Sequence, residues 1–382
     1  MDCRVINWLG KRFWKKHIYV LSASDRFNYG DLLFPFIVKH YFSDLACVIN
    51  CSTTQSDMSD RGALPTEDFS VLEKLSPSHR NILIIGGGEC LFCKWDVILG
   101  YVSEELSKVG NNYPTLYPFT VGKYELKNLR RVIYNSVGGY QLNERPDLYD
   151  DPMNRKLLKS ADYISVRDRV TSSGLSRMKL AHCLCADSAI LMSKIFSDKY
   201  LKENMSDNAK MLLSGKYLFF QIGLQHLKEW TKDYASILTR VSKEKNVHIC
   251  MCPIGTALGH DDPEALSRIS AYLPSDIYTM INNPSIWDIM GLIRWSEIYV
   301  GTSLHGAITA MSYRVPLIVH GPKKLQIYIE TWYDTIGSEY SFVSVDNLEK
   351  AVLRRMDTRF IISPEEQVRS VEKSIKRMRA LI

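Results

Sequence analysis

The chain has 382 residues, of which 46% are hydrophobic and 24% charged, with a formal net charge of +6. This composition is that of an ordinary folded protein and excludes the disordered and fibrous classes. The small positive excess favours an anionic substrate only weakly, and it excludes the strongly basic stripe that nucleic-acid binding requires. At this length we expect two domains, each burying its own core.

No apolar run reaches the ~20 residues that a membrane-spanning helix needs, and the first residues lack the apolar core of a signal peptide. Nine cysteines, an odd number, fit reduced thiols in a reducing compartment, so we expect a cytoplasmic location. Cys90 and Cys93 form a CxxC pair, but no second pair stands at zinc-site spacing. The sequence therefore predicts no metal site.

Aromatic and basic side chains are interleaved between Trp8 and Lys16. This mixture is typical of segments that lie at an anionic membrane surface. Two interpretations of Trp8 to Lys16 stay open: a basic helix that covers the edge of a sheet, which we favour, and peripheral contact with the inner face of a membrane.

Short apolar strands alternate with amphipathic stretches of helical length, and this pattern occurs twice. The expected strands are residues 17–22, 45–51, 81–85, 131–137 and 163–166 in the first half, and 216–222, 247–253, 277–281, 297–300 and 315–320 in the second. Such alternation is typical of parallel sheets covered by helices. We therefore expect an α/β fold with two Rossmann-like lobes, residues 1–195 and 196–382, that face a cleft.

Two further segments complete the expected fold. The polar stretch 193–214 predicts a linker with one short helix. Near the end of the chain, Ser363 is expected to cap a helix, with Pro364 in its first turn and Glu366 three residues after the cap. Apolar residues then recur at helical spacing, which predicts a C-terminal helix that packs back on the body.

The turn from Gly301 to Gly306 lies between an apolar strand and a helix. Gly301 allows a tight turn, and Thr302 or Ser303 is suited to cap the helix, whose free N–H groups attract an anion. His305 would then lie at the mouth of a phosphate site, where an imidazole can act as a general acid or base. The alternative is a histidine that only packs within the turn.

Two strand-to-helix turns in the first half also indicate a ligand close to the backbone. They read Asn28-Tyr29-Gly30-Asp31 and Gly86-Gly87-Gly88-Glu89. Consecutive glycines remove side chains where a ligand approaches, although a triple glycine has many structural explanations.

Charged groups end two other strands. Arg167 can offer its planar guanidinium to a carboxylate or phosphate, and the alternative is an ion pair with Asp168 or Asp187. His260 and Asp261 follow a strand-end turn, where they would face the cleft and contact a sugar hydroxyl. The alternative is that these residues only form a cluster of charges at the start of a helix.

In this order and spacing, the motifs resemble the polysaccharide pyruvyl transferase family. The motifs are NYGD, IIGGGE, SVRD, the Asp187 turn, the His260-Asp261-Asp262 turn and GTSLHGAITA ahead of a VP strand, and they span residues 28–324. The resemblance implies a GT-B-like fold, phosphoenolpyruvate as donor substrate with no cofactor, and a sugar acceptor that gains a pyruvate ketal. The acceptor would belong to a polysaccharide or its lipid-linked precursor.

Site residues follow from the same resemblance. His305 matches the family's catalytic histidine and Arg167 resembles a donor-binding arginine. Many members have an arginine where this chain has Ser303, so part of the anion clamp must be absent or come from elsewhere, and Arg167, Lys323 and Lys324 are the candidate replacements. The donor site is expected to include Arg167, Thr302, Ser303, Gly306, Lys323, Lys324, Asn28, Gly30 and Asp31, and the acceptor side of the cleft Gly86, Gly87, Gly88, Glu89, His260 and Asp261.

Two other functions fit the same pattern. One is a glycosyltransferase that uses a nucleotide sugar, since a phosphate site at a helix start would serve either donor. The other is a catalytically silent glycan-binding protein. A nicotinamide oxidoreductase is disfavoured, because the run Gly86 to Gly88 lacks the spaced third glycine of a dinucleotide site.

Overall fold

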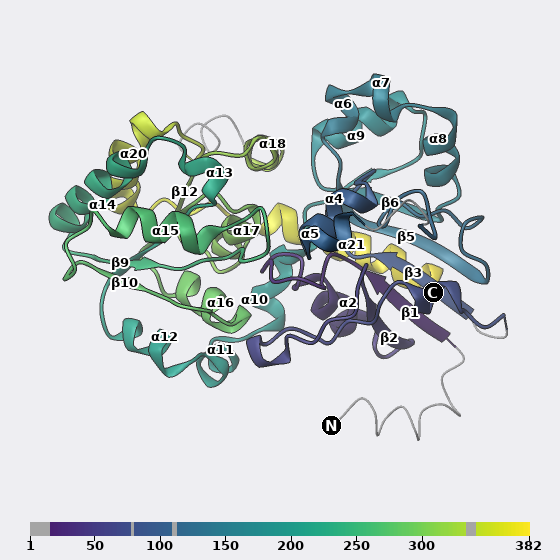
Figure 1. Cartoon of the computed structure of the whole chain (residues 1–382), viewed down its shortest axis with the longest axis horizontal. Coiled ribbons are helices and arrows are strands. Elements are labelled where there is room, and N and C mark those ends of the chain that lie inside the picture. Colours follow the sequence, from purple (N-terminus) through teal and green to yellow (C-terminus); the bar gives the residue numbers. More distant parts are fainter. Residues whose placement is uncertain (1–15, 78–79, 109–112, 334–340) are drawn as a thin grey trace.

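The chain forms two α/β lobes that lie side by side, each built on a parallel sheet (Figure 1). The structure is a computed structural model that describes residues 16–77, 80–108, 113–333 and 341–382. Most of the Trp8 to Lys16 segment therefore lies outside the described residues. Within them, no helix combines the length and the apolar character needed to cross a membrane.

The first lobe surrounds a sheet with the strand order β2-β1-β3-β5-β6-β7. Its strands are β1 (Lys16–Leu21), β2 (Cys47–Cys51), β3 (Arg80–Ile85), β5 (Leu129–Gly138), β6 (Tyr163–Val166) and β7 (Cys183–Leu184), with β4 (Gly88–Glu89) paired to β5. Its helices are α2 (Phe34–Phe42), η1 (Ser59–Arg61), α3 (Ser70–Glu73), α4 (Trp95–Gly100), α5 (Glu104–Ser107), α6 (Gln141–Glu144), α7 (Pro146–Tyr149), α8 (Pro152–Lys159) and α9 (Arg169–Arg177). The paired strands run parallel, so their carboxyl ends meet at one edge of the sheet.

The second lobe repeats this plan with the strand order β10-β9-β8-β11-β12. Its strands are β8 (Tyr217–Gln221), β9 (His248–Met251), β10 (Tyr278–Met280), β11 (Ile298–Gly301) and β12 (Leu317–Val319). Its helices are α13 (Leu224–Leu227), α14 (Thr231–Lys245), α15 (Asp262–Ser270), α16 (Ile286–Arg294), α17 (Leu304–Ser312), α18 (Lys323–Trp332) and α20 (Val345–Thr358). The connection between the lobes contains η2 (Ser188–Leu191), α10 (Met192–Ile195), α11 (Asp198–Asn204), α12 (Asp207–Met211) and η3 (Leu212–Ser214).

Every strand expected from the sequence is present, with ends shifted by at most two residues. The two-residue strands β4 and β7 were not predicted. The expectation of a linker with one short helix was wrong, because several helical turns fill residues 193–214. Serine side chains explain these turns, since Ser197 accepts from the Tyr200 N–H and Ser206 from the Ala209 N–H.

The apolar core differs from the expected pair of separate cores. One cluster is confined to the first lobe and another to the second. A further cluster joins both lobes, because buried side chains of β1 and α2 pack with those of η2, α16 and α17. Ile18, Phe34, Ile190 and Leu304 are among its members. The seam between the lobes is therefore packed like an interior.

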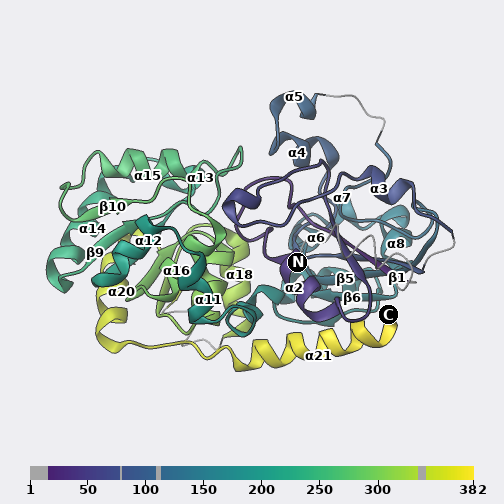
Figure 2. The same ribbon diagram turned by 90° about the horizontal axis from the view of Figure 1, so that it is seen from below.

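The C-terminal helix α21 (Glu365–Leu381) leaves the second lobe and runs along the first (Figure 2). The hydroxyls of Tyr163 and Ser374 lie 2.9 Å apart, and Nζ of Lys16 donates to the carbonyl of Ile382 at 2.7 Å. The expected return of this helix to the body is confirmed. The expectation that Ser363 caps this helix was wrong. The helix begins at Glu365 after Pro364, and no side chain forms a capping hydrogen bond.

Candidate active site

The turn that follows β11 is held rigidly by side-chain hydrogen bonds. Oε1 of Gln221 accepts from the N–H groups of Thr302 (3.1 Å) and Ser303 (3.0 Å). Oγ of Ser303 then caps α17 by accepting from the Gly306 N–H at 3.2 Å. Two N–H groups of this turn are therefore already bonded to Gln221. Thr302 and Ser303 fix the position of His305 in the first turn of the helix.

His305 reaches from the second lobe to residues of the first. Its Nε2 lies 3.4 Å from Oδ2 of Asp187, which is ion-pair distance without the alignment of a hydrogen bond. The ring packs edge-on against Phe34, and a Cβ atom on Gly30 would lie only 1.7 Å from Nδ1. The imidazole is 11% exposed, so it is enclosed but still reachable.

Asp187 connects His305 to a buried ion-pair network. Nη1 of Arg167 lies 3.1 Å from Oδ2 of Asp187, and Nη2 lies 2.7 Å from Oε2 of Glu89. Oε1 of Glu89 accepts from the Tyr140 N–H at 2.9 Å. Because Arg167 is only 2% exposed, its guanidinium is committed to these two carboxylates. The structure thus shows the ion pair with Asp187 that was the alternative to direct anion binding.

The network keeps Asp187 and Arg167 charged. Burial raises the pKa of Asp187, but the contact with His305 and the charges of His305 and Arg167 outweigh it and hold that pKa below its usual value. Burial lowers the pKa of Arg167, but the carboxylates of Glu89, Asp187 and Asp168 raise it further than burial lowers it. Asp187 is therefore a fixed negative charge beside the histidine.

Lys324, in the first turn of α18, is a cation near Arg167 that takes no part in these ion pairs. Within the described part of the chain its ammonium has no ion-pair partner, whereas Lys323 pairs with Glu144. Burial and the charge of Arg167 lower the pKa of Lys324. Burial, followed by Lys324, also lowers the pKa of His226, to about 4, and that of His260. An anion that entered here would meet the charge of Lys324, which the carboxylates of Glu89 and Asp31 oppose in part.

The remaining predicted residues support the site more than they line it. The side-chain amide of Asn28 donates to Asp31 at 2.7 Å, and a Cβ atom on Gly88 would lie 3.2 Å from Oδ1 of Asp31. Gly87 makes room for the Phe34 ring, against which His305 packs, and Gly86 lies close to Cβ of Phe34. The glycine run therefore shapes the wall behind the histidine.

The lobes also contact each other through residues other than His305. His260 stacks on Tyr101 with ring centroids 5.8 Å apart, and the Tyr29 N–H donates to the carbonyl of Ile254 at 3.1 Å. Asp261 accepts from the Gly259 N–H within its own turn. Asp262 faces inward to Gln221 and the turn after β9, so the three residues of this motif do not converge.

Sequence reasoning missed three residues that build the site: Phe34, Gln221 and His226. Gln221 had a signal, since a polar residue that ends an otherwise apolar strand must find a buried partner. Phe34 and His226 had none, because their contacts join residues far apart in the chain, such as Phe34 with Gly87 and His226 with Gly321.

Comparison with known proteins agrees with this arrangement. A sequence profile described as polysaccharide pyruvyl transferase matches residues 28–322. No curated protein matches the sequence.

Solved structures with the same fold include UDP-GlcNAc 2-epimerases. The enzyme from Methanocaldococcus jannaschii superposes with a TM-score of 0.58 at 11% identity, covering 95% of this chain and 99% of its own. That from Rickettsia bellii gives 0.54 at 13%, covering 95% of each chain. At such low identity this similarity shows the fold alone, which is the two-lobed GT-B arrangement. The profile match covers most of the chain, and the chain therefore belongs to the polysaccharide pyruvyl transferase family.

Proposed function

We propose that this protein transfers the pyruvyl group of phosphoenolpyruvate to two hydroxyls of a sugar, forming a cyclic ketal and releasing phosphate. One observation carries the proposal. His305 lies where the lobes meet, in contact with Asp187, which pairs with Arg167. The charge of Arg167 in turn acts on Lys324, whose ammonium has no ion-pair partner among the described residues. Family membership supports the class of reaction.

In the proposed mechanism His305 acts as a general acid. It protonates the methylene carbon of phosphoenolpyruvate, which leaves positive charge on the neighbouring carbon. One sugar hydroxyl attacks that carbon and loses its proton. Phosphate then departs with its bonding electrons, and the second hydroxyl closes the ring as its own proton is lost. Asp187 orients the imidazole throughout.

The donor's negative charges need a partner, since Ser303 stands where many family members have an arginine. Three replacements were expected: Arg167, Lys323 and Lys324. Arg167 and Lys323 are engaged in ion pairs, whereas Lys324 has none among the described residues. We therefore assign the contact with the donor's phosphate or carboxylate to Lys324, with Arg167 acting through Asp187. Preorganised cations of this kind stabilise a departing phosphate well.

The test is phosphate release on mixing the protein with phosphoenolpyruvate and a panel of soluble and lipid-linked saccharides. His305→Ala should reduce acceptor-dependent release by at least ~10²-fold, because a general acid is lost. His40→Ala, which removes an exposed histidine on α2, is the matched control. Binding of a nucleotide sugar without phosphate release would favour a glycosyltransferase instead, and saccharide binding without release a silent glycan-binding protein.

The acceptor is proposed to be lipid-linked, on the basis of the basic and aromatic side chains between Trp8 and Lys16. Deleting the first sixteen residues should then weaken binding to anionic vesicles while phosphate release with a soluble acceptor is retained. Unchanged vesicle binding would remove the reason for this part of the proposal.

A further inference from the structure

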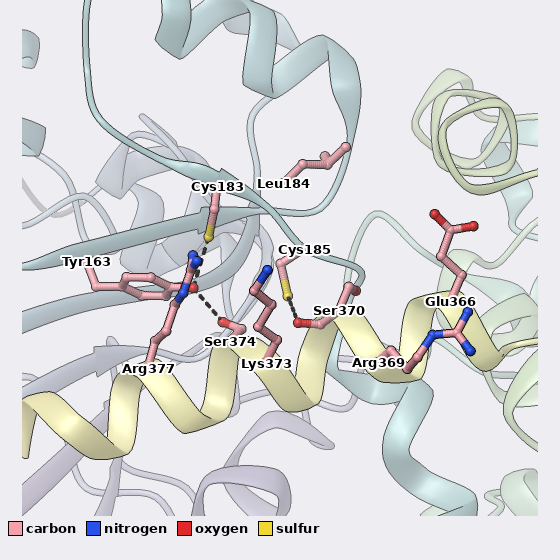
Figure 3. Close-up of a pocket in the computed structure, with 10 residues that line it drawn as sticks. All are labelled: Tyr163, Cys183, Leu184, Cys185, Glu366, Arg369, Ser370, Lys373, Ser374 and Arg377. Carbon is pink, nitrogen blue, oxygen red and sulfur yellow. Dashed lines mark hydrogen bonds between the residues drawn. The ribbon is translucent and has the colours of Figure 1, made fainter.

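A cavity lies away from the His305 site, between α21 and the edge of the first sheet (Figure 3). Its volume is about 350 Å³, within the usual range for a small-molecule pocket. Arg369, Lys373 and Arg377 line it from the helix, and Tyr163 and Leu184 line it from strands β6 and β7. We call this cavity the α21 groove.

The three cations of the α21 groove stand four residues apart, so they share one face of the helix. Figure 3 shows Lys373 and Arg377 rising from α21 toward the strands, whereas Arg369 extends along the helix toward Glu366. All three are exposed, and none forms an ion pair with any acid in the described ranges. Neighbouring like charges at this spacing repel each other and weaken a helix. A bound anion would relieve that repulsion.

Nearby acids do not neutralise the row of cations. Glu365 pairs with Arg314 and also interacts with the charge of Arg369, and Glu372 pairs with Lys194. Glu366 lines one end of the groove and is the acid closest to the row among its lining residues. The row therefore keeps most of its positive charge.

The floor of the groove is polar but uncharged. The Tyr163 hydroxyl lies 2.9 Å from both Sγ of Cys183 and Oγ of Ser374. Burial raises the pKa of Tyr163 above its usual value and that of Cys185 to about 11, so both groups stay neutral at physiological pH. The floor thus offers hydroxyl and thiol groups to a ligand without opposing its negative charge.

We propose that the α21 groove binds a ligand that carries a diphosphate or two phosphate groups. The geometry favours this class, because a rise of 1.5 Å per residue places the Cα atoms of the three residues about 6 Å apart. Three cations spread along the helix in this way can converge on the several oxygens of two phosphates, whereas a single small anion would reach fewer of them. Arginine forks and a lysine are the side chains that bind phosphate oxygens most readily. The phosphates belong either to a soluble molecule or to a lipid headgroup.

Calorimetry with sodium pyrophosphate tests the proposal on the full chain. The groove variant is Arg369→Gln/Lys373→Gln/Arg377→Gln, and a charge-matched control is Lys108→Gln/Lys243→Gln/Lys350→Gln, at exposed positions elsewhere. The groove variant should raise the Kd of one pyrophosphate site by at least about 30-fold, because charge-assisted contacts are lost. The control should leave that site in place, and so should His305→Ala, since His305 is not among the residues that line the groove.

A second arm identifies the source of the phosphates. Sedimentation with vesicles of phosphatidylcholine and phosphatidic acid should retain the wild type but not the groove variant if the ligand is a lipid headgroup. Pyrophosphate binding without vesicle retention means a soluble ligand. Equal binding of pyrophosphate and vesicles by the wild type and the groove variant overturns the proposal, as does an equal loss in the control. Binding of neither probe by the wild type overturns it too.

Folding is checked by the melting temperature without ligand. Removing like-charge repulsion should leave it unchanged or raise it slightly, whereas a purely structural role for these cations would lower it. If the triple variant is unstable, Lys373→Gln alone removes the central charge and should still weaken pyrophosphate binding. Hydrogen exchange should show protection of residues 366–377 on adding pyrophosphate to the wild type, and its absence would contradict binding in this groove.

Discussion

Replacing Gly30 by alanine is the sharpest test of how the histidine is held. The new Cβ atom would lie 1.7 Å from Nδ1, 2.1 Å from Cγ and 2.6 Å from Cε1 of His305, all far below van der Waals contact. Gly30 does not have a positive φ, so the backbone accepts alanine without strain and the collision is the whole effect. Overpacking of this kind costs about 1–3 kcal/mol of unfolding free energy. The displaced imidazole should also lose Asp187, with phosphate release falling by ~10²-fold or more.

The assay is a double-mutant cycle with urea unfolding and phosphate release. In the His305→Ala background, Gly30→Ala should cost little stability, because the ring that it strikes is gone. Gly215→Ala is the control for glycine replacement, since no atom lies within 4 Å of its added Cβ. Full activity in Gly30→Ala, or stability losses that add in the double variant, would refute the packing described here.

Three further changes test the charges and the fold. Asp187→Asn should lower the unfolding free energy by about 3 kcal/mol at pH 7, because Arg167 loses a buried partner. Since the folded pKa of Asp187 is lowered, this stabilisation is lost as pH falls below about 4, so urea curves of wild type and variant should converge in acid. Burial raises the pKa of Asp262 to about 7, so wild-type stability should fall relative to Asp262→Asn as pH rises from about 4 to 7, and a constant difference would contradict this. Ser285→Ala removes the cap of α16 and should cost about 1 kcal/mol without changing phosphate release, which a thermal melt and the release assay check together.

Much of the fold could be predicted because its strands are buried on both faces and read as continuous apolar runs. The strand β3 is an example, with Asn81 to Ile85 all buried. The strands β4 and β7 were missed because each has two residues, too few to show the pattern of apolar residues that predicts a strand. The helical turns between residues 193 and 214 were missed because their stability comes from serine caps and tertiary contacts.

The site was predictable in its residue types and less so in its contacts. A glycine-rich turn between a strand and a helix pointed to His305, and a strand end pointed to Arg167. Which carboxylates surround Arg167 depends on Glu89 and Asp187, which are 78 and 20 residues away along the chain. Such contacts are set by how strands order themselves in the sheet, which no local pattern encodes.

The apolar cluster that joins the lobes has a consequence for how this protein unfolds. Lobes that meet through a thin polar interface melt separately, but here β1 and α2 share buried neighbours with α16 and α17. Separating them would expose those side chains to water, so neither lobe is expected to persist once the other is lost. Heating should then produce one cooperative transition, and His305, at the edge of this seam, should keep its place until the whole molecule melts.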